Sequence, residues 1–386
     1  MNDLFSVYIH WPFCISKCPY CDFNSHVSET IDHEDWEKSY LQELDFYAGL
    51  TEGRRVSSVF FGGGTPSLMQ PETVAAIVDR IRNNWSMAED AEITLEANPT
   101  SVETEKFNAF KRAGVNRVSI GVQSFQDKDL KFLGRQHDSK MAIEAIETAK
   151  SIFGRTSFDL IYARPGQTLC AWEQELRTAL KYAGGHLSAY QLTIEQGTPF
   201  YMRRERGDFS MPGEDLAADF YELTQDILSA HGLPSYEVSN HARAGEESVH
   251  NLTYWRYGDY AGIGPGAHGR LTLGAEKQAT RGHRAPDVWR QNVKEKGHGG
   301  HPFERIFERE RFIECLMMGL RLHEGVRISK LEEEGGDSFE TLLDRKKLEC
   351  LKGEGLVDWD QERLWAQPKG LACLNGVLSY LLQAPL

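Results

Sequence analysis

Short runs rich in β-branched and aromatic residues alternate with longer amphipathic stretches through the first half of the chain. Such runs predict strands, and stretches with a helical period predict helices. We expect strands at Ser6–Trp11, Val56–Phe61, Ala91–Glu96, Arg117–Val122, Ser157–Tyr162 and Leu187–Thr193. We expect helices at Asp35–Ala48, Pro71–Asn84, Val102–Lys111, Met141–Phe153 and Ala171–Ala183. The alternation implies parallel βαβ units. It predicts an α/β fold with an open (β/α)6 barrel, and a flat doubly wound sheet is the alternative.

Chemically distinctive residues stand at the end of each predicted strand. They are His10 to Cys21, Gly62–Gly64, Glu96, Gln123, Asp159 with Arg164, and Glu195. The carboxyl ends of parallel barrel strands meet at one mouth, where active sites lie. We therefore expect these residues to share one pocket. The alternative is that strand ends are polar only because the chain turns there.

The pattern changes after about Asn240. The motif HNLTYW occupies His250–Trp255, and a glycine-rich turn follows at Gly262–Gly269. Residues 274–300 are basic and rich in glycine, which we interpret as a flexible connector. The sequence thus predicts a barrel over residues 1–238 and a connecting segment with the motif over residues 239–300.

The remaining residues, 301–386, predict a third segment. It is rich in helix from Arg305, and two apolar runs around a polar turn at Leu356–Trp365 predict a hairpin. A last helix is expected at Leu371–Leu382. Helices followed by a two-stranded wing indicate a mainly helical, winged-helix-like domain.

Composition narrows the function classes. The chain has 386 residues and a formal net charge of −14, which argues against nonspecific binding to nucleic acid. The first residues lack the basic and apolar regions of a secretory signal. No run of about 18 apolar residues predicts a membrane-spanning helix. Scattered cysteines without obvious partners predict a reducing, cytoplasmic location.

The strongest chemical signal is the run CISKCPYC, which places Cys14, Cys18 and Cys21 within eight residues. Thiolates are the natural ligands of iron–sulfur clusters, which normally take four of them. Phe23 stands where a fourth ligand would follow, and the other cysteines lie far away in the sequence. A four-iron cluster on three thiolates keeps one iron open, as catalytic zinc sites keep an open position.

Three other readings of the cysteines stay open. A zinc site would take its fourth ligand from His10 or His26. A disulfide would leave one cysteine over and would require an oxidising compartment. A redox-active pair would use Cys18 and Cys21 alone.

The run resembles the CxxxCxxC signature of the radical S-adenosylmethionine (SAM) superfamily. The longer string YIHWPFCISKCPYCDF resembles, within it, the oxygen-independent coproporphyrinogen oxidase-like group. The resemblance implies a [4Fe–4S] cluster on Cys14, Cys18 and Cys21, with SAM chelating the open iron. It also implies a partial (β/α)6 TIM-like barrel of the radical SAM type, followed by the C-terminal domain of this group.

The same resemblance assigns a SAM site. The residues that it implies are Tyr8, Tyr20, Gly63, Gly64, Thr65, Glu96, Gln123, Arg135 and Asp159. Each also has a structural alternative. The charged residues could form ion pairs at the barrel rim, Gln123 could cap a helix, and Tyr8 could be half-buried packing.

Two features indicate which proteins of this group the chain resembles most. The decarboxylating enzymes carry CxxxCxxCxC and a longer N-terminal extension, whereas Phe23 holds the last motif position here. The string HNLTYW resembles the HNxxYW motif that is associated with haem in the haem chaperones of this family. A neutral imidazole can ligate haem iron, so His250 is the candidate ligand. Alternatively, His250 caps a turn beside a core tryptophan.

We therefore predict a haem chaperone that holds haem and a SAM-coordinated cluster and delivers haem to client haem proteins. An electron donor, such as a flavodoxin-type protein, would reduce the cluster. SAM cleavage is compatible with this fold, so enzymatic activity stays open. One alternative is an oxygen-independent coproporphyrinogen III oxidase, although Phe23 argues against it. The other is an iron–sulfur scaffold without SAM chemistry.

Overall fold

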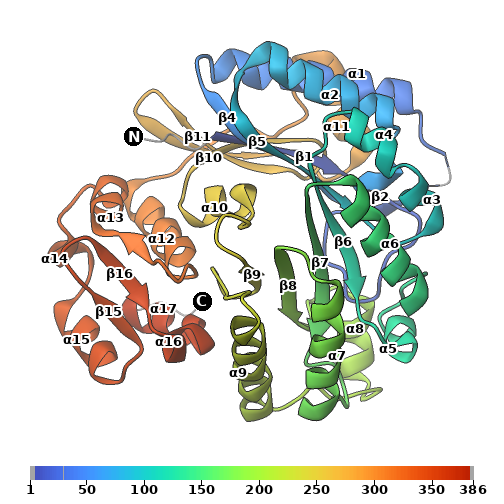
Figure 1. Cartoon of the computed structure of the whole chain (residues 1–386). Helices are drawn as coiled ribbons and strands as arrows, with labels where there is room; N and C mark the ends of the chain where they lie inside the picture. The colour runs from blue at the N-terminus through green and yellow to red at the C-terminus, as the bar shows by residue number, and fades with distance from the viewer. Residues whose placement is uncertain (1–4, 29, 383–386) are drawn as a thin grey trace.

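The computed structural model describes residues 5–28 and 30–382, and eleven strands of this part of the chain form one sheet (Figure 1). Its central strands are β1 (Phe5–Trp11), β4 (Arg55–Gly63), β5 (Ser86–Ala97), β6 (Arg117–Gln123), β7 (Arg155–Tyr162) and β8 (His186–Gln191). These six are parallel and lie side by side in chain order. A doubly wound sheet reverses its strand order at a switch point. This order does not reverse, so the prediction of an open (β/α)6 barrel is confirmed.

Helices connect these strands and bury an apolar stripe against them. They are α1 (His33–Leu50), α2 (Pro71–Asn84), α3 (Ser101–Glu105), α4 (Phe107–Arg112), α5 (Asp127–Phe132), α6 (Ser139–Ile152) and α7 (Leu169–Tyr182). Their starts follow from local chemistry: Pro71 occupies the first turn of α2, and the side chains of Asp138 and Thr168 cap α6 and α7. The helix predicted at Val102–Lys111 is divided at Lys106 into two short helices.

Several elements were not expected from the sequence. They are β2 (Phe13–Cys14), β3 (His26–Val27), the 3-10 helix η1 (Pro66–Leu68), α8 (Pro199–Glu205), α9 (Glu214–Ala230), β9 (Asn240–Ala242) and α10 (Val249–Trp255). Of these, β2 and β3 pair with each other, β9 lies antiparallel to β8, and α10 contacts β4 and β10.

The prediction of a flexible connector over residues 274–300 is wrong. These residues include β12 (Glu276–Arg281) and α11 (Pro286–Lys296). The strand β12 belongs to a run of four with β10 (Asp259–Ile263), β11 (His268–Leu273) and β13 (Glu304–Arg305). Of these strands, β10 pairs parallel with β1, and the others extend the sheet antiparallel. The glycines that suggested flexibility serve turns: Gly274 and Gly297 have φ of +63° and +84°.

The C-terminal elements form a separate, mainly helical layer beside α10 (Figure 1). They are α12 (Glu308–Gly319), β14 (Val326–Arg327), α13 (Ile328–Gly335), α14 (Phe339–Leu342), α15 (Arg345–Gly353), β15 (Val357–Trp359), β16 (Arg363–Ala366), α16 (Pro368–Ala372) and α17 (Leu374–Leu382). The predicted hairpin is confirmed as β15 and β16, with β14 as a third strand. The last predicted helix breaks at Cys373.

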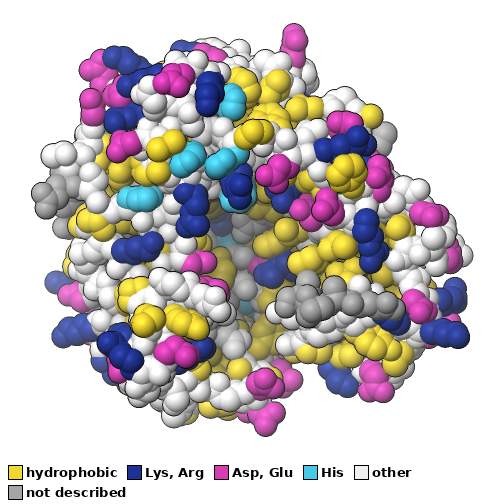
Figure 2. Space-filling view, turned by 180° about the vertical axis from the view of Figure 1, so that it is seen from behind, with side chains coloured by type: hydrophobic (Ala, Val, Ile, Leu, Met, Phe, Trp, Pro, Cys, Tyr) yellow, Lys and Arg dark blue, Asp and Glu magenta, His cyan; other side chains and the backbone are white. Residues whose placement is uncertain are grey.

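Two apolar cores support these two parts. The larger lies between the barrel strands and their helices and includes fully buried Trp11, Trp172 and Trp289. The smaller lies among the C-terminal elements, around Phe312 and Leu331. Seen from behind, the surface is hollowed between the two lobes (Figure 2). The division of the chain at residues 238 and 300 stays a prediction. None of the helices in the described residues has the length and apolar character to cross a membrane.

Candidate cluster and cofactor site

A pocket of about 160 Å³ lies at the carboxyl ends of the barrel strands. Its lining includes eleven of the residues selected from the sequence: Cys14, Cys18, Tyr20, Cys21, Gly63, Gly64, Thr65, Glu96, Gln123, Arg135 and Asp159. They come from the loop after β1 and from the ends of β4, β5, β6 and β7, with Arg135 just after α5. The expectation of a shared pocket is therefore met by these residues. Their roles toward a cluster or SAM stay predictions.

Each cysteine of the run has a hydrogen-bonding side chain from elsewhere beside its sulfur. Thr65 Oγ1 donates to the Sγ of Cys14 at 3.4 Å, and Arg135 Nη1 donates to the Sγ of Cys18 at 3.4 Å. Ser25 Oγ lies 3.9 Å from the Sγ of Cys21. Donors of this kind stabilise negative charge on sulfur. The loop is thus equipped to present three thiolates.

Burial opposes ionisation of these thiols when no cation is present. It raises the pKa of Cys14, although the Thr65 hydrogen bond acts in the opposite direction. Burial likewise raises the pKa of Cys21. A bound metal reverses this balance because coordination deprotonates a thiol. The described cysteines form no disulfide, so the disulfide reading has no support.

A zinc site would need His10 or His26 as its fourth ligand, and both side chains already form hydrogen bonds. His10 is buried, its Nδ1 lies 3.0 Å from the hydroxyl of Tyr8, and its Nε2 lies 2.9 Å from the carbonyl oxygen of Asn24. The Nε2 of His26 lies 3.3 Å from the side-chain oxygen of Asn24. Within residues 5–28 and 30–382, no three His, Cys, Asp or Glu side chains converge as ligands of a single metal ion.

The glycine turn after β4 packs against the cysteine loop. The backbone N–H of Gly64 donates to the carbonyl of Trp11 at 2.7 Å, and that of Thr65 donates to Phe13 at 2.8 Å. A Cβ on Gly64 would lie 2.6 Å from the carbonyl oxygen of Phe13. Gly63 has a φ of +109°, which a side chain would rarely tolerate. These glycines therefore allow the backbone of β4 to support the loop directly.

Two carboxyl groups give the pocket its electrostatic character. Burial, and then the charge of Asp159, raise the pKa of Glu96 to about 8. Burial raises the pKa of Asp159 to about 6, and a hydrogen bond from Ser188 opposes this. Neither residue forms an ion pair among the described residues, so the rim ion-pair alternative is not seen. A cationic ligand would relieve the repulsion between these two carboxylates and favour their ionised forms.

Gln123 and Arg135 complete the floor of the pocket. Gln123 has a φ of +68°, and strained backbone of this kind clusters at functional sites. It does not cap α5, which begins after Gln126. The Nη2 of Arg135 donates to the carbonyl of Gly121 at 2.8 Å, while its buried Nε has no partner in the described structure. Arg135 can therefore offer a further N–H to an anionic group.

Comparison with known proteins identifies the family. Residues 8–179 match the Radical SAM superfamily, and residues 308–373 match the HemN C-terminal domain. The heme chaperone HemW of Escherichia coli (strain K12) is 45% identical over 271 residues, which are 69% of this chain and 70% of that protein. The chain belongs to the radical SAM superfamily, in the HemN-like group that includes HemW.

Other relatives extend the match over the whole chain. The heme chaperone HemW of Bacillus subtilis is 34% identical over 98% of this chain and 99% of its own. The mitochondrial radical S-adenosyl methionine domain-containing protein 1 of Mus musculus is 40% identical, over 98% of this chain and 87% of that protein. The structure of coproporphyrinogen III oxidase (HemN) from Escherichia coli, at 22% identity, has a TM-score of 0.81 and covers 98% of this chain and 90% of that one. This likeness establishes the fold.

The radical SAM family implies a [4Fe–4S] cluster and SAM, and the residues of the pocket fit both. Three thiols, each beside a hydrogen-bonding side chain, suit the cluster. The carboxyl groups of Glu96 and Asp159 suit a ligand with a sulfonium and an amino group. The unpartnered Nε of Arg135 suits the carboxylate of that ligand.

Asn98 is a pocket residue of this radical SAM barrel that the sequence analysis did not select. Asn98 links the pocket's polar groups, because its Nδ2 donates to Thr65 at 3.1 Å and its Oδ1 accepts from Arg135. Its position two residues after Glu96 was the available signal. Arg164 and Glu195, expected at the mouth, do not line the pocket. Arg164 is instead buried in an ion pair with Glu175 at 2.5 Å.

The remaining candidates, Tyr8 and His250, lie outside the pocket. His250 is on α10 and is 1% exposed. Its Nδ1 lies 2.9 Å from Ser58 Oγ, and its Nε2 lies 2.5 Å from the Tyr254 hydroxyl. Burial lowers the pKa of His250 to about 3, so the ring is neutral. Both nitrogens are thus engaged, and a role as haem ligand stays a prediction that requires one hydrogen bond to break.

Proposed function

We propose that this radical SAM protein binds haem together with a [4Fe–4S] cluster completed by SAM, and that it delivers haem to haem proteins. The observation that carries the proposal is Phe23. Its side chain, 60% exposed, occupies the motif position where decarboxylating enzymes of the group have a cysteine. Relatives that share 33–45% identity with this chain are named haem chaperones, which supports the proposal.

The pocket residues receive roles within this proposal. Cys14, Cys18 and Cys21 would hold the cluster, which, when bound and reduced, supplies the electron for SAM chemistry. The Gly63–Thr65 turn would lie against the amino acid end of SAM. Glu96 and Asp159 would attract its positive charge, and Arg135 would pair with its carboxylate. Gln123, in its strained conformation, would line the same ligand.

The haem site is proposed around α10. His250 would be the axial ligand, after its hydrogen bond to Tyr254 opens. Tyr254 and Trp255 would then be free to pack on the macrocycle. Ser248 caps this helix, and the buried carboxylate of Glu92 accepts hydrogen bonds from its first turn at 3.3 Å. The helix is therefore held at its start, while its end faces the C-terminal elements.

Haem titration of the wild type, His250→Ala and the matched surface variant His231→Ala tests this function. The wild type and His231→Ala are expected to bind haem with the same spectrum and to transfer it to an apo-haem protein. His250→Ala is expected to lose the histidine-ligated spectrum. Equal affinities and spectra would remove His250 as a ligand. A wild type that binds no haem would overturn the proposal.

Oxidation of coproporphyrinogen III is the second candidate. It is favoured by the pocket that joins the three cysteines to Glu96 and Asp159 in one site, because such a site could serve SAM chemistry on a substrate. Anaerobic turnover of coproporphyrinogen III with SAM and a reductant would establish it and demote the chaperone. Failure of the reconstituted cluster to bind SAM would instead favour a scaffold without SAM chemistry.

The proposed partners are client haem proteins and a flavodoxin-type electron donor. Nucleic acid is not expected, given the net charge of −14. The cytoplasmic location stays a prediction, since some relatives are named as mitochondrial.

A further inference from the structure

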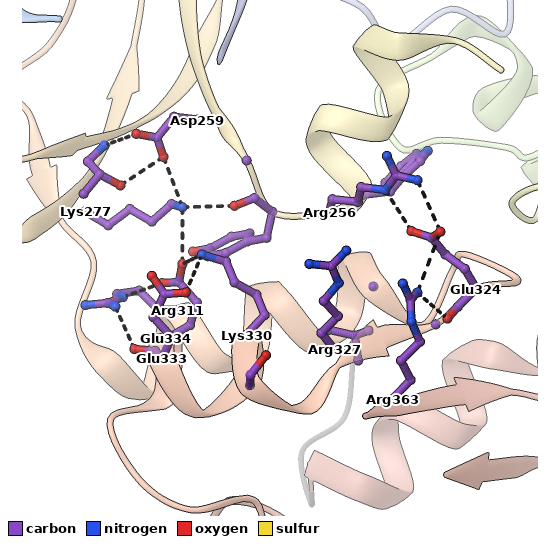
Figure 3. Close-up of a pocket in the computed structure, with 18 of the residues that line it drawn as sticks. Arg256, Asp259, Lys277, Arg311, Glu324, Arg327, Lys330, Glu333, Glu334 and Arg363 are labelled. Atoms are coloured by element: carbon purple, nitrogen blue, oxygen red, sulfur yellow. Dashed lines mark hydrogen bonds and ion pairs between the residues drawn. The ribbon is translucent and has the colours of Figure 1, made fainter. Parts of the chain in front are cut away.

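A second cavity, of about 860 Å³, shares no lining residue with the pocket at the cysteine loop. Figure 3 shows the charged side chains that line it. Its walls are the loop between α10 and β10, the β11–β12 hairpin, and the C-terminal elements α13, β14 and β16. Asp259 in its wall pairs in register with Phe5 at the start of β1, and Arg54 precedes β4. The cavity therefore opens at the amino ends of the barrel strands. The length of β1 separates it from the cluster pocket, roughly 20 Å for seven extended residues.

Positive side chains outnumber negative ones in this cavity, on a chain that is acidic overall. Its cations are Arg54, Arg256, Lys277, Arg311, Arg327, Lys330 and Arg363, and its carboxylates are Asp259, Glu324, Glu333 and Glu334. The carboxylates are shared. Glu324 lies 2.8 Å from Arg256 and 3.7 Å from Arg363. Glu334 pairs with three cations, at 2.7 Å with Arg311, 2.8 Å with Lys330 and 3.7 Å with Lys277.

Arg327 is a cation of this cavity that takes no part in the network of ion pairs. Its side chain has no ion pair or hydrogen bond among the described residues, and it lies between the Lys330 and Glu324 groups (Figure 3). It also stands at the start of α13, where no side chain caps the helix. Ser329, in the first turn, lines the same cavity. A free guanidinium beside an uncapped helix start favours an anion with planar oxygens.

An aromatic wall adjoins these charges. Trp255 and Tyr257 line the cavity, and the indole Nε1 of Trp255 is buried without a partner in the described structure. Trp255 is also the last residue of HNLTYW, so the motif that begins at His250 inside the barrel ends at this cavity. The size lies in the usual range of small-molecule sites. A ligand with a flat apolar body and carboxylate arms matches this combination.

We infer that this cavity binds the propionate carboxylates of haem, with Arg327 as the main anion-binding residue and Trp255 beside the macrocycle. The inference rests on the proposed function, which supplies haem as the ligand. It adds where haem enters and which charges select it. A phosphate-bearing ligand shares the anionic chemistry, so the test must separate the two sources.

The test compares haem binding by the wild type, Arg327→Gln, Arg327→Lys and the control Arg112→Gln. The Arg327 side chain has no ion-pair or hydrogen-bond partner among the described residues, so its variants are expected to fold. Arg112 is exposed at the end of α4, and its side chain forms no ion pair or hydrogen bond within the described residues. The haem Kd of Arg327→Gln is expected to rise about tenfold, as for one charged hydrogen bond. Arg327→Lys should recover part of the affinity, and Arg112→Gln should match the wild type.

Two further ligands show whether the bound anion is a carboxylate or a phosphate. Haem dimethyl ester, which lacks free carboxylates, is expected to bind the wild type and Arg327→Gln equally. Pyrophosphate is expected to compete only weakly with haem. Equal haem affinities of the wild type and Arg327→Gln would overturn the cavity assignment and leave the proposed function standing. Arg327-dependent pyrophosphate binding with unchanged haem affinity would also overturn it. Absence of haem binding by the wild type would overturn both proposals.

Discussion

The two ends of one barrel have opposite electrostatics. At the carboxyl ends of the strands, burial raises the pKa of Glu96 to about 8 and that of Asp159 to about 6. At the amino ends, burial also acts on Glu324 and Glu334, yet the neighbouring arginines and lysines hold the pKa of each below its usual value. The first end suits a cationic ligand and the second an anionic one. A single sheet can therefore keep two unlike ligands apart.

The ends also differ in how the chain builds them. The carboxyl-end pocket is made from residues 14–159, most of them in the loop after β1 or near the ends of successive strands. The amino-end cavity joins Arg54 to residues 255–363, which come from two different lobes. The former is a product of barrel topology, whereas the latter exists only because the C-terminal elements dock beside α10.

The largest expected effect is confined to the carboxyl end. Cys14→Ala, Cys18→Ala or Cys21→Ala should each remove the iron–sulfur absorbance completely, because a cluster on three thiolates cannot spare one. Haem affinity should stay at the wild-type value if the amino-end cavity holds haem. Iron, sulfide and haem analyses of anaerobically reconstituted protein measure both.

Cys170→Ala, at an exposed cysteine outside the pocket, is the matched control and should keep the cluster. A Cys18→Ala variant with full iron and sulfide would place the cluster elsewhere.

The next effect concerns the buried carboxylate of Glu92, which holds the start of α10. Glu92 on β5 pairs with Arg155 at 2.8 Å and with buried Arg117 at 3.8 Å, and it accepts hydrogen bonds from the first turn of α10. Glu92→Gln should lower the free energy of unfolding by about 3–5 kcal/mol, because Arg117 loses its counter-charge in the interior. Urea denaturation measures this.

Glu89→Gln, at an exposed glutamate on the same strand, should change stability by no more than about 0.5 kcal/mol. If Glu92→Gln behaves like this control, the buried pair does not hold α10 in place.

The sequence predicted the carboxyl end far better than the amino end. Alternating strands and helices gave the six barrel strands, and their ends gave the pocket, because parallel topology brings such ends together without knowledge of any long-range contact. Asn98 was not predicted, because its hydrogen bonds to Thr65 and Arg135 depend on tertiary geometry. The strands β10–β13 were not predicted because glycines that form turns, such as Gly274 and Gly297, are equally typical of a flexible linker.

The amino-end cavity was beyond the sequence for a different reason. Its charged residues are scattered over 300 positions, and nothing local distinguishes Arg327 from any surface arginine. Lys330 reaches Glu334 within α13 itself, whereas only the docking of α13 against the β11–β12 hairpin brings Lys277 to the same carboxylate. The motif HNLTYW pointed to the region, although His250 itself proved to be buried away from both cavities.

A moderate effect is expected in the pH dependence of SAM binding. Asp159 ionises near pH 6 and Glu96 near pH 8, and ionised carboxylates attract the sulfonium. Affinity should therefore rise with pH over this range, and Glu96→Gln should lose the upper part of the rise. Equilibrium dialysis of SAM against reconstituted protein measures it, and a flat profile would contradict the assignment.

The same groups affect folding in the opposite direction. The folded-state pKa of Glu96, about 8, lies above the ordinary value of 4.5. The folded state therefore binds the proton more tightly, and the contribution of Glu96 to stability is fully present below pH 4.5 and is lost as the pH rises to about 8. Glu96→Gln should flatten this part of the stability profile.

The smallest effect tests whether the hydrogen bonds to sulfur act on the cluster. Thr65→Val keeps the shape of the side chain but removes the donor to Cys14 and the acceptor for Asn98. The cluster should form, and its midpoint potential should become more negative, because the added electron loses about 1 kcal/mol of stabilisation from one hydrogen bond. Thr65→Ser retains the hydroxyl and should match the wild type in redox titration. Equal potentials in Thr65→Val and Thr65→Ser would mean that Thr65 only supports the loop. The donors beside the other two sulfurs, Arg135 at Cys18 and Ser25 at Cys21, would then be the groups to test next.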